Sequence, residues 1–246
     1  MFSLHIDDVL RQIDSLGRCA SCDQLAAKHY CHTYIGPRYG KSTRVLIIGL
    51  DHGQDYTENA SDRQKQILHY RQVESIPMGL NQHYRGCVLV AAETLGFRCA
   101  TECARRCSFK AEEECALLHF AQGNAVKCTA GGEGMTFRRQ ERIRECFPLM
   151  LGEIQILRPH VIVLQGRNQG TGHIHEDFKK LAETCGTWEM TDNELLRVVR
   201  WGDWSFSSIV ASFRHPSRGY QSRDWEPIIR PAIARARELL AHDNSS

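Results

Sequence analysis

Three side chains suited to acid–base chemistry or molecular recognition follow segments that read as strands in this chain of 246 residues. Asp51 follows the apolar run 44–48 after two residues. Asn124 lies at the end of a second apolar run, and His215 follows a third. In open α/β sheets the chemistry gathers at the carboxyl ends of the strands. A carboxylate can orient water, an imidazole can donate a proton, and an amide offers both a donor and an acceptor. The sequence therefore predicts a site at one edge of a parallel sheet, with His52 beside Asp51.

The elements that must position these residues are predicted from apolar periodicity. A crossover unit spans residues 124–166 and runs from a strand end through a Gly-rich loop and a helix into a short apolar strand. Helix-like spacing predicts helices over 3–16, 61–71, 86–95, 170–185 and 225–240, and apolar runs predict strands over 44–48, 119–125, 161–164, 195–201 and 208–212. The length suits one α/β domain, with or without a small appendage.

Composition narrows the class of protein. The hydrophobic share of 42% is enough for a core, and the net charge of +2 permits a local basic patch for nucleic acid without requiring one. No apolar run approaches the ~20 residues of a membrane span, and the start of the chain, with Asp7 and Asp8, lacks a signal pattern. We expect a soluble, cytoplasmic protein without a membrane partner. Eleven cysteines in such a chain favour metal or cluster ligation over disulfides.

Four cysteines are spaced as one ligand set. Cys19 and Cys22 form a C-x-x-C pair, at which two thiolates can share a metal or cluster, and Cys128 and Cys146 form a wider pair across the crossover unit. Four thiolates fit either a four-iron, four-sulfur (4Fe-4S) cluster or a structural zinc. The alternative is that some of them are simply buried thiols, because Cys is among the most buried residue types.

Two other groups compete for the same role. The first would be a zinc site that joins Cys19 and Cys22 to His29, Cys31 and His32. The second comprises Cys99, Cys103, Cys107 and Cys115, which could form a separate site or a half-buried stripe on a helix within an insert.

Six motifs in order resemble the uracil-DNA glycosylase superfamily, and most closely its iron-sulfur branch, family 4. The family carries a C-x-x-C pair, a strand ending in G-E-A-P-G, an N-V-V-K-C block, a further Cys, an L-R-P-x-V-I-V-x-L-G junction and an H-P-S motif. Here these correspond to Cys19 and Cys22, Gly49-Leu-Asp-His-Gly53, Asn124-Ala-Val-Lys-Cys128, Cys146, Leu157-Arg-Pro-His-Val-Ile-Val-Leu-Gln-Gly166 and His215-Pro-Ser217. The block over 120–166 is the most specific part of the resemblance.

The resemblance implies a fold, a cofactor and a partner. The fold would be a three-layer α/β/α domain over 1–246 with a central, mainly parallel four-stranded sheet. The cofactor would be a structural 4Fe-4S cluster on the four cysteines of the two pairs, with zinc as the alternative. The partner would be DNA, bound by a monomer.

The resemblance also implies a reaction, the hydrolysis of an N-glycosidic bond in a flipped-out nucleotide. Asp51 would position water and support the positively charged sugar, and His215 would donate to the O2 oxyanion of the departing base. Asn124 would read the edge of the base and Tyr84 would stack on it. Asp51 as a helix cap, Asn124 as a turn residue, His215 as a structural histidine and Tyr84 as a core aromatic are the alternatives.

The remaining site residues flank these four. Gly49 and Gly53 would allow the backbone to approach the substrate closely, with Leu50 beside the base. His52 would help to position the water or the phosphate, the alternative being that it only fills the position of the family Pro. Ser217 completes the H-P-S motif. Basic and aromatic side chains interleave on the loop after the last strand, where they suit phosphate contacts and a wedge into the duplex. These are Arg214, Arg218 and Tyr220. A solvated charged loop is the alternative.

The first motif departs from the family. Leu50 stands where the family has Glu, and Asp51 and His52 stand where it has Ala and Pro. An Asp at this point is similar to the G-Q-D-P-Y motif of the family 1 enzymes, where that Asp acts on the water. The segment of about 54–118 is also longer and richer in Cys than in the family. We therefore expect a monofunctional DNA glycosylase for uracil or a modified pyrimidine, such as a bulky modified cytosine of phage DNA, in repair or antiviral defence. The alternative is an inactive iron-sulfur or zinc protein that binds DNA.

Overall fold

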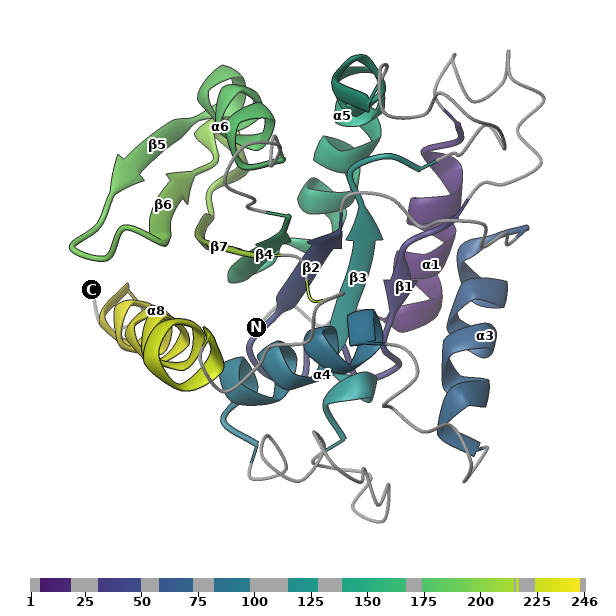
Figure 1. Cartoon of the computed structure of the whole chain (residues 1–246). Helices are drawn as coiled ribbons and strands as arrows, with labels where there is room; N and C mark the ends of the chain where they lie inside the picture. Colours follow the sequence, from purple (N-terminus) through teal and green to yellow (C-terminus); the bar gives the residue numbers. More distant parts are fainter. Residues whose placement is uncertain are drawn as a thin grey trace.

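A seven-stranded sheet forms the centre of the molecule, with helices on both faces (Figure 1). The computed structural model describes residues 5–18, 31–49, 58–72, 82–97, 115–127, 139–166, 174–214, 216 and 224–243. In these ranges no helix is long and apolar enough to cross a membrane.

The sheet has a parallel centre and antiparallel edges. Its strands are β1 (Tyr34–Ile35), β2 (Val45–Gly49), β3 (Phe120–Asn124), β4 (Val161–Gln165), β5 (Thr187–Met190), β6 (Leu196–Arg200) and β7 (Ser207–Phe213). They lie in the order β1-β3-β2-β4-β7-β6-β5. Neighbours among β3, β2, β4 and β7 are parallel, whereas β1, β6 and β5 pair antiparallel. The expectation of a mixed, mainly parallel α/β fold is confirmed, but the described residues form a sheet of seven strands where four were expected.

The strands that the sequence did not predict are the two at the sheet edges. β1 has two residues, too few for any periodicity, and β5 is the largely exposed outer strand of a hairpin with β6. The strands expected at 44–48, 119–125, 161–164, 195–201 and 208–212 are confirmed as β2, β3, β4, β6 and β7. A buried strand with apolar side chains on both faces has a strong sequence signal, and an exposed edge strand has a weak one.

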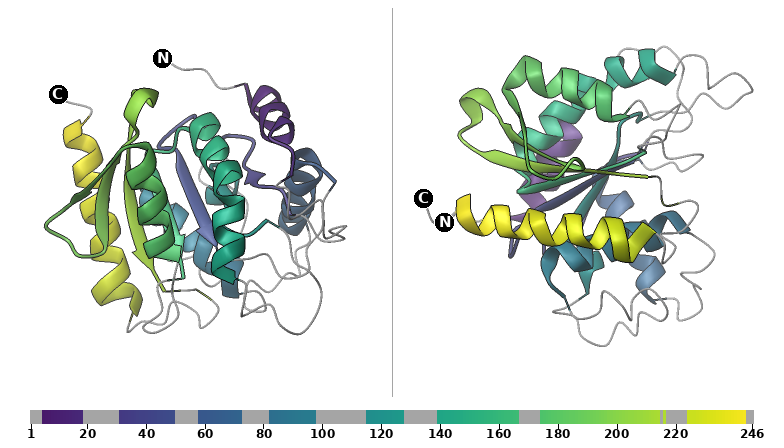
Figure 2. Two further views of the ribbon diagram at one scale, coloured as in Figure 1. Left: turned by 90° about the horizontal axis from the view of Figure 1, so that it is seen from above. Right: turned by 60° about the vertical axis from the view of Figure 1, so that its left-hand side comes forward.

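Helices cover the two faces of the sheet as separate layers. The helices are α1 (Ile6–Ser15), α3 (Ala60–Gln72), α4 (Gln82–Leu95), α5 (Arg139–Leu157), α6 (Ile174–Cys185) and α8 (Arg230–Asp243), with short turns η3 (Ala116–Leu118) and η4 (Gly202–Trp204) and a π-helical turn η6 (Trp225–Ile229). Figure 2 shows α4 and α8 on one face and α1, α5 and α6 on the other. The helix expected at 86–95 begins four residues earlier, at Gln82. Although α4 falls within the expected insert of about 54–118, it covers the central sheet.

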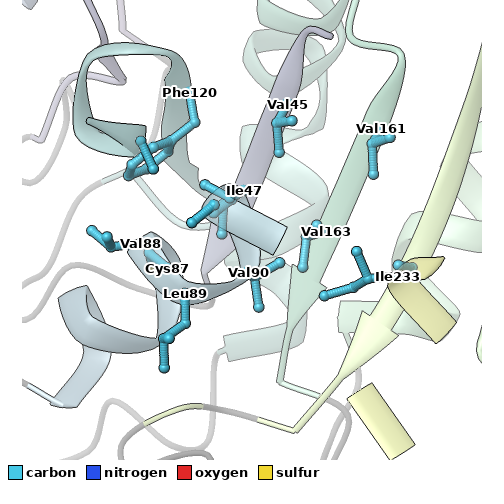
Figure 3. Packing of buried hydrophobic residues seen from close by; sticks show 14 of the residues in the cluster. Val45, Ile47, Cys87, Val88, Leu89, Val90, Phe120, Val161, Val163 and Ile233 are labelled. Carbon is cyan, nitrogen blue, oxygen red and sulfur yellow. The ribbon is translucent and has the colours of Figure 1, made fainter. Parts of the chain in front are cut away.

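The core consists of one apolar cluster on each face of the sheet. In β2, Val45 and Ile47 belong to the cluster beneath α4 and α8, where Val90 and Ile233 also lie (Figure 3). The alternate residues of β2 belong to the cluster beneath α1, α5 and α6. Successive side chains of a strand point to opposite faces, so a strand covered on both faces must be apolar throughout. This is why the run 44–48 carries so clear a signal.

Candidate functional site

Four residues form a row along the carboxyl edge of the parallel strands. Gly49 of β2 pairs with Asn124 of β3, and Gln165 of β4 pairs with Phe213 of β7. Gln165 is also the residue that follows Leu164, the partner of Ile48, so it lies next to Gly49. The row therefore runs Asn124, Gly49, Gln165, Phe213 and spans ~14 Å at the usual distance between strands. From β2 the chain leads to β3 on one side and then to β4 on the other side of β2. The place between β2 and β4 is therefore the topological switch point at which open α/β sheets bind ligands.

The side chains of this row share one face of the sheet. Phe120 in β3, Val163 in β4 and Ala211 in β7 all belong to the cluster beneath α4 and α8. Asn124, Gln165 and Phe213 lie an even number of residues further along these strands, so alternation places them on the same face. Gly49 has no side chain between the two amides. The row thus places two amides and an aromatic ring on the side of the sheet that α4 covers, and all three side chains are buried.

Helix α4 is anchored to this row by a buried thiol. Cys87 lies in α4 and its Sγ–H donates to Oε1 of Gln165, at 3.2 Å. Burial raises the pKa of Cys87 to about 12, so the thiol stays protonated as a donor. Tyr84 lies three residues before Cys87 in the same helix, ~4.5 Å along its axis. The backbone of Tyr84, the predicted stacking residue, thus belongs to the helix that covers the row, and its side chain lies outside the described part of the structure.

The turn that follows Asn124 is held on two sides. The Ala125 N–H donates to the Gly49 carbonyl at 2.8 Å, which continues the β2–β3 pairing past the strand ends. The Cys31 N–H donates to the Lys127 carbonyl at 3.0 Å. Asn124 itself is 6% exposed. The predicted base reader thus lies at a rigid strand end rather than on a free loop.

A buried ionic network lies behind this turn. Lys127 is 0% exposed, and its ammonium donates to Thr33 Oγ1 and to the Glu153 carboxylate, at 2.7 Å in each case. The Thr33 hydroxyl in turn donates to Glu153 Oε1 at 2.6 Å. Each member thus satisfies the others, which is the condition under which charged groups persist in a protein interior.

Of the four predicted cluster cysteines, the structure describes only Cys146. It is buried in α5, seven residues before Glu153 and so on the same face of the helix. Glu153 contacts Lys127, the last described residue before Cys128 in the sequence, and this contact lies about two helical turns along α5 from Cys146. Within the described ranges no group of three or more His, Cys, Asp and Glu side chains could hold a metal ion. Cys19, Cys22 and Cys128 lie outside those ranges.

His32, proposed above as part of a rival zinc site, is engaged elsewhere. Its Nε2–H donates to the Glu58 carbonyl at 3.0 Å, and its Nδ1 lies 3.5 Å from the Asp14 carboxylate. Burial lowers the pKa of His32. The imidazole thus links α1 to the segment before α3. Zinc ligation would have to use Nδ1 in place of the Asp14 contact, while Nε2–H could keep the Glu58 carbonyl. Cys31 is buried, as is Cys115 of the group over 99–115.

The predicted residues of the two strand-end loops lie outside the described residues. They are Leu50, Asp51, His52 and Gly53 after β2, and His215, Ser217, Arg218 and Tyr220 after β7. The strands that lead to them end at Gly49 and Phe213, both in the row at the carboxyl edge. Arg214 is exposed, with its guanidinium 4.0 Å from the Asp224 carboxylate. Pro216 of the H-P-S motif is buried.

Several residues of the site carry no prediction from the sequence. Gln165 closes an otherwise apolar strand, and this polar strand end is a signal that could have identified it. Lys127 follows the apolar pair Ala125-Val126, which is a similar signal. Glu153 and Cys87 sit within helices, where no local pattern separates them from surface or core residues. Only the tertiary contacts reveal their roles.

Comparison of the sequence with protein-family models and with curated proteins gives no match to either.

Proposed function

We propose that this protein is a monofunctional DNA glycosylase that hydrolyses the N-glycosidic bond of a flipped-out pyrimidine and leaves an abasic site. The observation that carries the proposal is the pairing of Gly49 with Asn124 at the carboxyl edge, in the same row as the end of β7. The motifs that begin at Gly49 and at Asn124 thereby meet at one point. The H-P-S motif begins at His215, two residues after Phe213 in the chain. The expected catalytic and reading groups follow β2, β7 and β3, three strands of the parallel centre in which β4 lies between β2 and β7. A site at the carboxyl ends of such strands, around a switch point, is typical of open α/β sheets.

The reaction needs groups of three kinds. Cleavage builds positive charge on the sugar and negative charge on the departing base, so a carboxylate and a hydrogen-bond donor must face opposite ends of the breaking bond. Asp51 supplies the carboxylate and orients the water, and His215 donates to the oxyanion of the base. Asn124 reads the edge of the base with its amide, and Gly49 leaves room for the substrate beside it. Tyr84 provides the stacking ring.

The proposal includes an iron-sulfur cluster on Cys19, Cys22, Cys128 and Cys146, of which the described residues include Cys146 alone. Cys146 is a buried thiol, and the Lys127–Glu153 contact brings the neighbour of Cys128 close to the same helix. Hydrolysis of this bond transfers no electrons, so a bound cluster would supply structure and not chemistry. It would tie Cys19 and Cys22 to the crossover unit. Zinc on the same thiolates is the alternative, which the visible absorption of anaerobically purified protein distinguishes.

The excised base is uracil or a modified pyrimidine. Leu50 in place of the family Glu removes a charged group from the first motif. A less polar lining of this kind favours bases other than uracil, including a bulky modified cytosine as found in phage DNA. A role in repair or in antiviral defence follows from the base, for a monomer that acts on DNA in the cytoplasm.

The proposal is tested with a panel of duplexes that carry uracil, hypoxanthine, xanthine, or hydroxymethylated or glucosylated cytosine. Purified protein with its metal content measured is incubated with each duplex, and abasic sites are scored by alkali cleavage. We expect abasic product from at least one pyrimidine duplex. No product from any of them, with four cysteines ligated, would overturn the proposal.

A second function, a DNA-binding protein without activity, is favoured by the altered first motif, Leu50-Asp51-His52. The substitution Asp51→Asn separates the two, because the amide cannot carry the negative charge that supports the sugar. A glycosylase should lose turnover by at least ~10²-fold while retaining DNA affinity. A binding protein should show the same affinity and no turnover in both forms.

A further inference from the structure

The network of Thr33, Lys127 and Glu153 connects three segments that are distant in the sequence. Thr33 directly precedes β1, Lys127 follows β3 after a short turn, and Glu153 lies in α5. Their exposed fractions are 0%, 0% and 4%. A lysine and a glutamate this deeply buried lose their hydration, and apolar side chains of similar volume would often give a fold of equal or higher stability. Stability alone therefore does not account for an ion pair at this place.

The network supports the strand end from the face opposite to Asn124. Gly123 directly precedes Asn124, and a Cβ added there would meet Thr33 Oγ1 at 3.0 Å, Lys127 Nζ at 3.2 Å and Glu153 Oε2 at 3.3 Å. The three polar groups thus lie against the backbone of Gly123. Because successive residues of a strand face opposite sides, the Asn124 amide lies on the other side, toward α4.

The same network fixes the turn after Asn124. The Lys127 side chain is bound by Thr33 and Glu153, while its carbonyl accepts the Cys31 N–H at 3.0 Å. At the other end of the turn, the Ala125 N–H donates to the Gly49 carbonyl at 2.8 Å. A turn of this length, held at both ends, leaves the backbone of Asn124 little freedom to move along or away from the row.

We propose that Lys127, Glu153 and Thr33 are positioning residues that hold Asn124 at the carboxyl edge in the geometry needed to read the base. This inference rests on the proposed function for what Asn124 reads, but the positioning itself is a property of the fold. An amide that reads a base edge must be held closely, since a displacement of 1 Å can cost ~10²-fold in rate. A network of charged hydrogen bonds with one satisfied arrangement provides such a hold.

The first arm of the test does not depend on activity. The double variant Lys127→Met/Glu153→Leu replaces the ion pair by apolar side chains of similar volume. Hydrogen exchange followed by mass spectrometry compares peptides that cover 120–127 with peptides that cover β4. We expect amide exchange in the peptides that cover 120–127 to accelerate at least tenfold, while exchange in the peptides that cover β4 stays unchanged. Unchanged exchange over 120–127 in a folded variant would overturn the positioning.

The second arm measures base recognition. Single-turnover base release is followed on the preferred duplex of the panel and on the next best one. We expect the double variant to lose ten- to a hundredfold in rate and to lose discrimination between the two bases. Adding Asn124→Ala to it should then cost little more, because residues that act as a unit are not additive. Losses that simply add, or discrimination that stays intact, would contradict a role through Asn124.

Matched variants separate positioning from folding. Thr33→Ser keeps the hydroxyl and should retain discrimination, whereas the near-isosteric Thr33→Val should reduce it. Ser208→Ala is the structural control, since Ser208 Oγ accepts from Trp201 Nε1 at 2.9 Å and donates to the Pro159 carbonyl at 2.7 Å, at the amino end of β7. It should lower the melting temperature and leave discrimination unchanged. If the wild-type protein releases no base at all, the proposed function fails, while the exchange arm still decides the positioning.

Discussion

Asn124 lies at the end of β3 with its backbone beside Gly49 and its side chain on the face that α4 covers. At the scale of single residues, the proposed reading of the base depends most on this amide. We expect Asn124→Ala to lower the single-turnover rate by ~10²-fold, since a site built to hydrogen-bond its substrate loses strongly when one partner is removed. Gln122→Ala is the matched control, an amide on the same strand and face but in the middle of the strand rather than at its end. Equal losses in the two variants would argue against a reading role.

His160 makes the stability of the fold depend on pH. Burial, with the nearby Arg44 charge as a second cause, lowers the pKa of His160 to about 4, and its Nδ1 accepts the Arg44 N–H at 3.2 Å. The unfolded chain takes up this proton from pH 6.5 downward and the folded chain only near pH 4, so stability is lost as the pH falls through this window. We expect His160→Asn, which keeps an acceptor but does not titrate, to lose less stability between pH 7 and 4.5 in urea unfolding. Parallel losses in the two proteins would contradict this.

At the scale of elements, the close approach of β1 to the chain before β3 depends on Gly36. A Cβ added at Gly36 would overlap the backbone carbonyl of Leu118, and the Gly36 N–H donates to the Phe120 carbonyl at 3.0 Å. We expect Gly36→Ala to destabilise the fold by ~1–3 kcal/mol, because backbone cannot move aside as a side chain can. Gly152→Ala in α5 is the control, since its Cβ would meet only side-chain atoms of Leu16. Thermal unfolding measures both, and an equal effect would contradict the argument.

The elements also show what could be predicted from the sequence. β2 and β4 were predictable because both of their faces are buried and their side chains are apolar throughout. β1 was not, because two residues carry no pattern, and β5 was not, because its side chains are largely exposed. The convergence of Gly49 and Asn124 was expected from the motifs, and the register confirms that these strand ends are neighbours.

The supporting contacts could not be predicted in the same way. Lys127 and Glu153 are 26 residues apart and meet only because α5 packs behind β3. Cys87 contacts Gln165 across two layers of the fold, 78 residues apart. Neither pair has a local spacing that identifies it. The roles of Asp51 and His215 stay predictions, because these residues lie outside the described ranges.

At the scale of the whole molecule, the net charge of +2 gives too weak a field to bind DNA by overall attraction. Under the proposed function, affinity for DNA would come from a local group of cations near the carboxyl edge. Arg214, which follows β7 and is exposed, is the predicted member of that group that the structure describes. We expect Arg214→Ala to weaken binding uniformly across sequences and to reduce the slope of log affinity against log salt by about 1. Titration of a labelled duplex at several salt concentrations measures the slope. The exposed Arg200, which pairs with Glu189 on the β5–β6 hairpin, is the control, and an equal change in Arg200→Ala would contradict a local site.

The central claim is that the carboxyl edge of the sheet catalyses hydrolysis of an N-glycosidic bond. Mass spectrometry of the small molecules released from the duplex panel tests it most directly, because it identifies both the bond cleaved and the base. The account predicts a free pyrimidine base in amounts equal to the abasic sites, with release reduced at least ~10²-fold in Asp51→Asn. No free base, or release that is the same in the wild-type protein and Asp51→Asn, would contradict it.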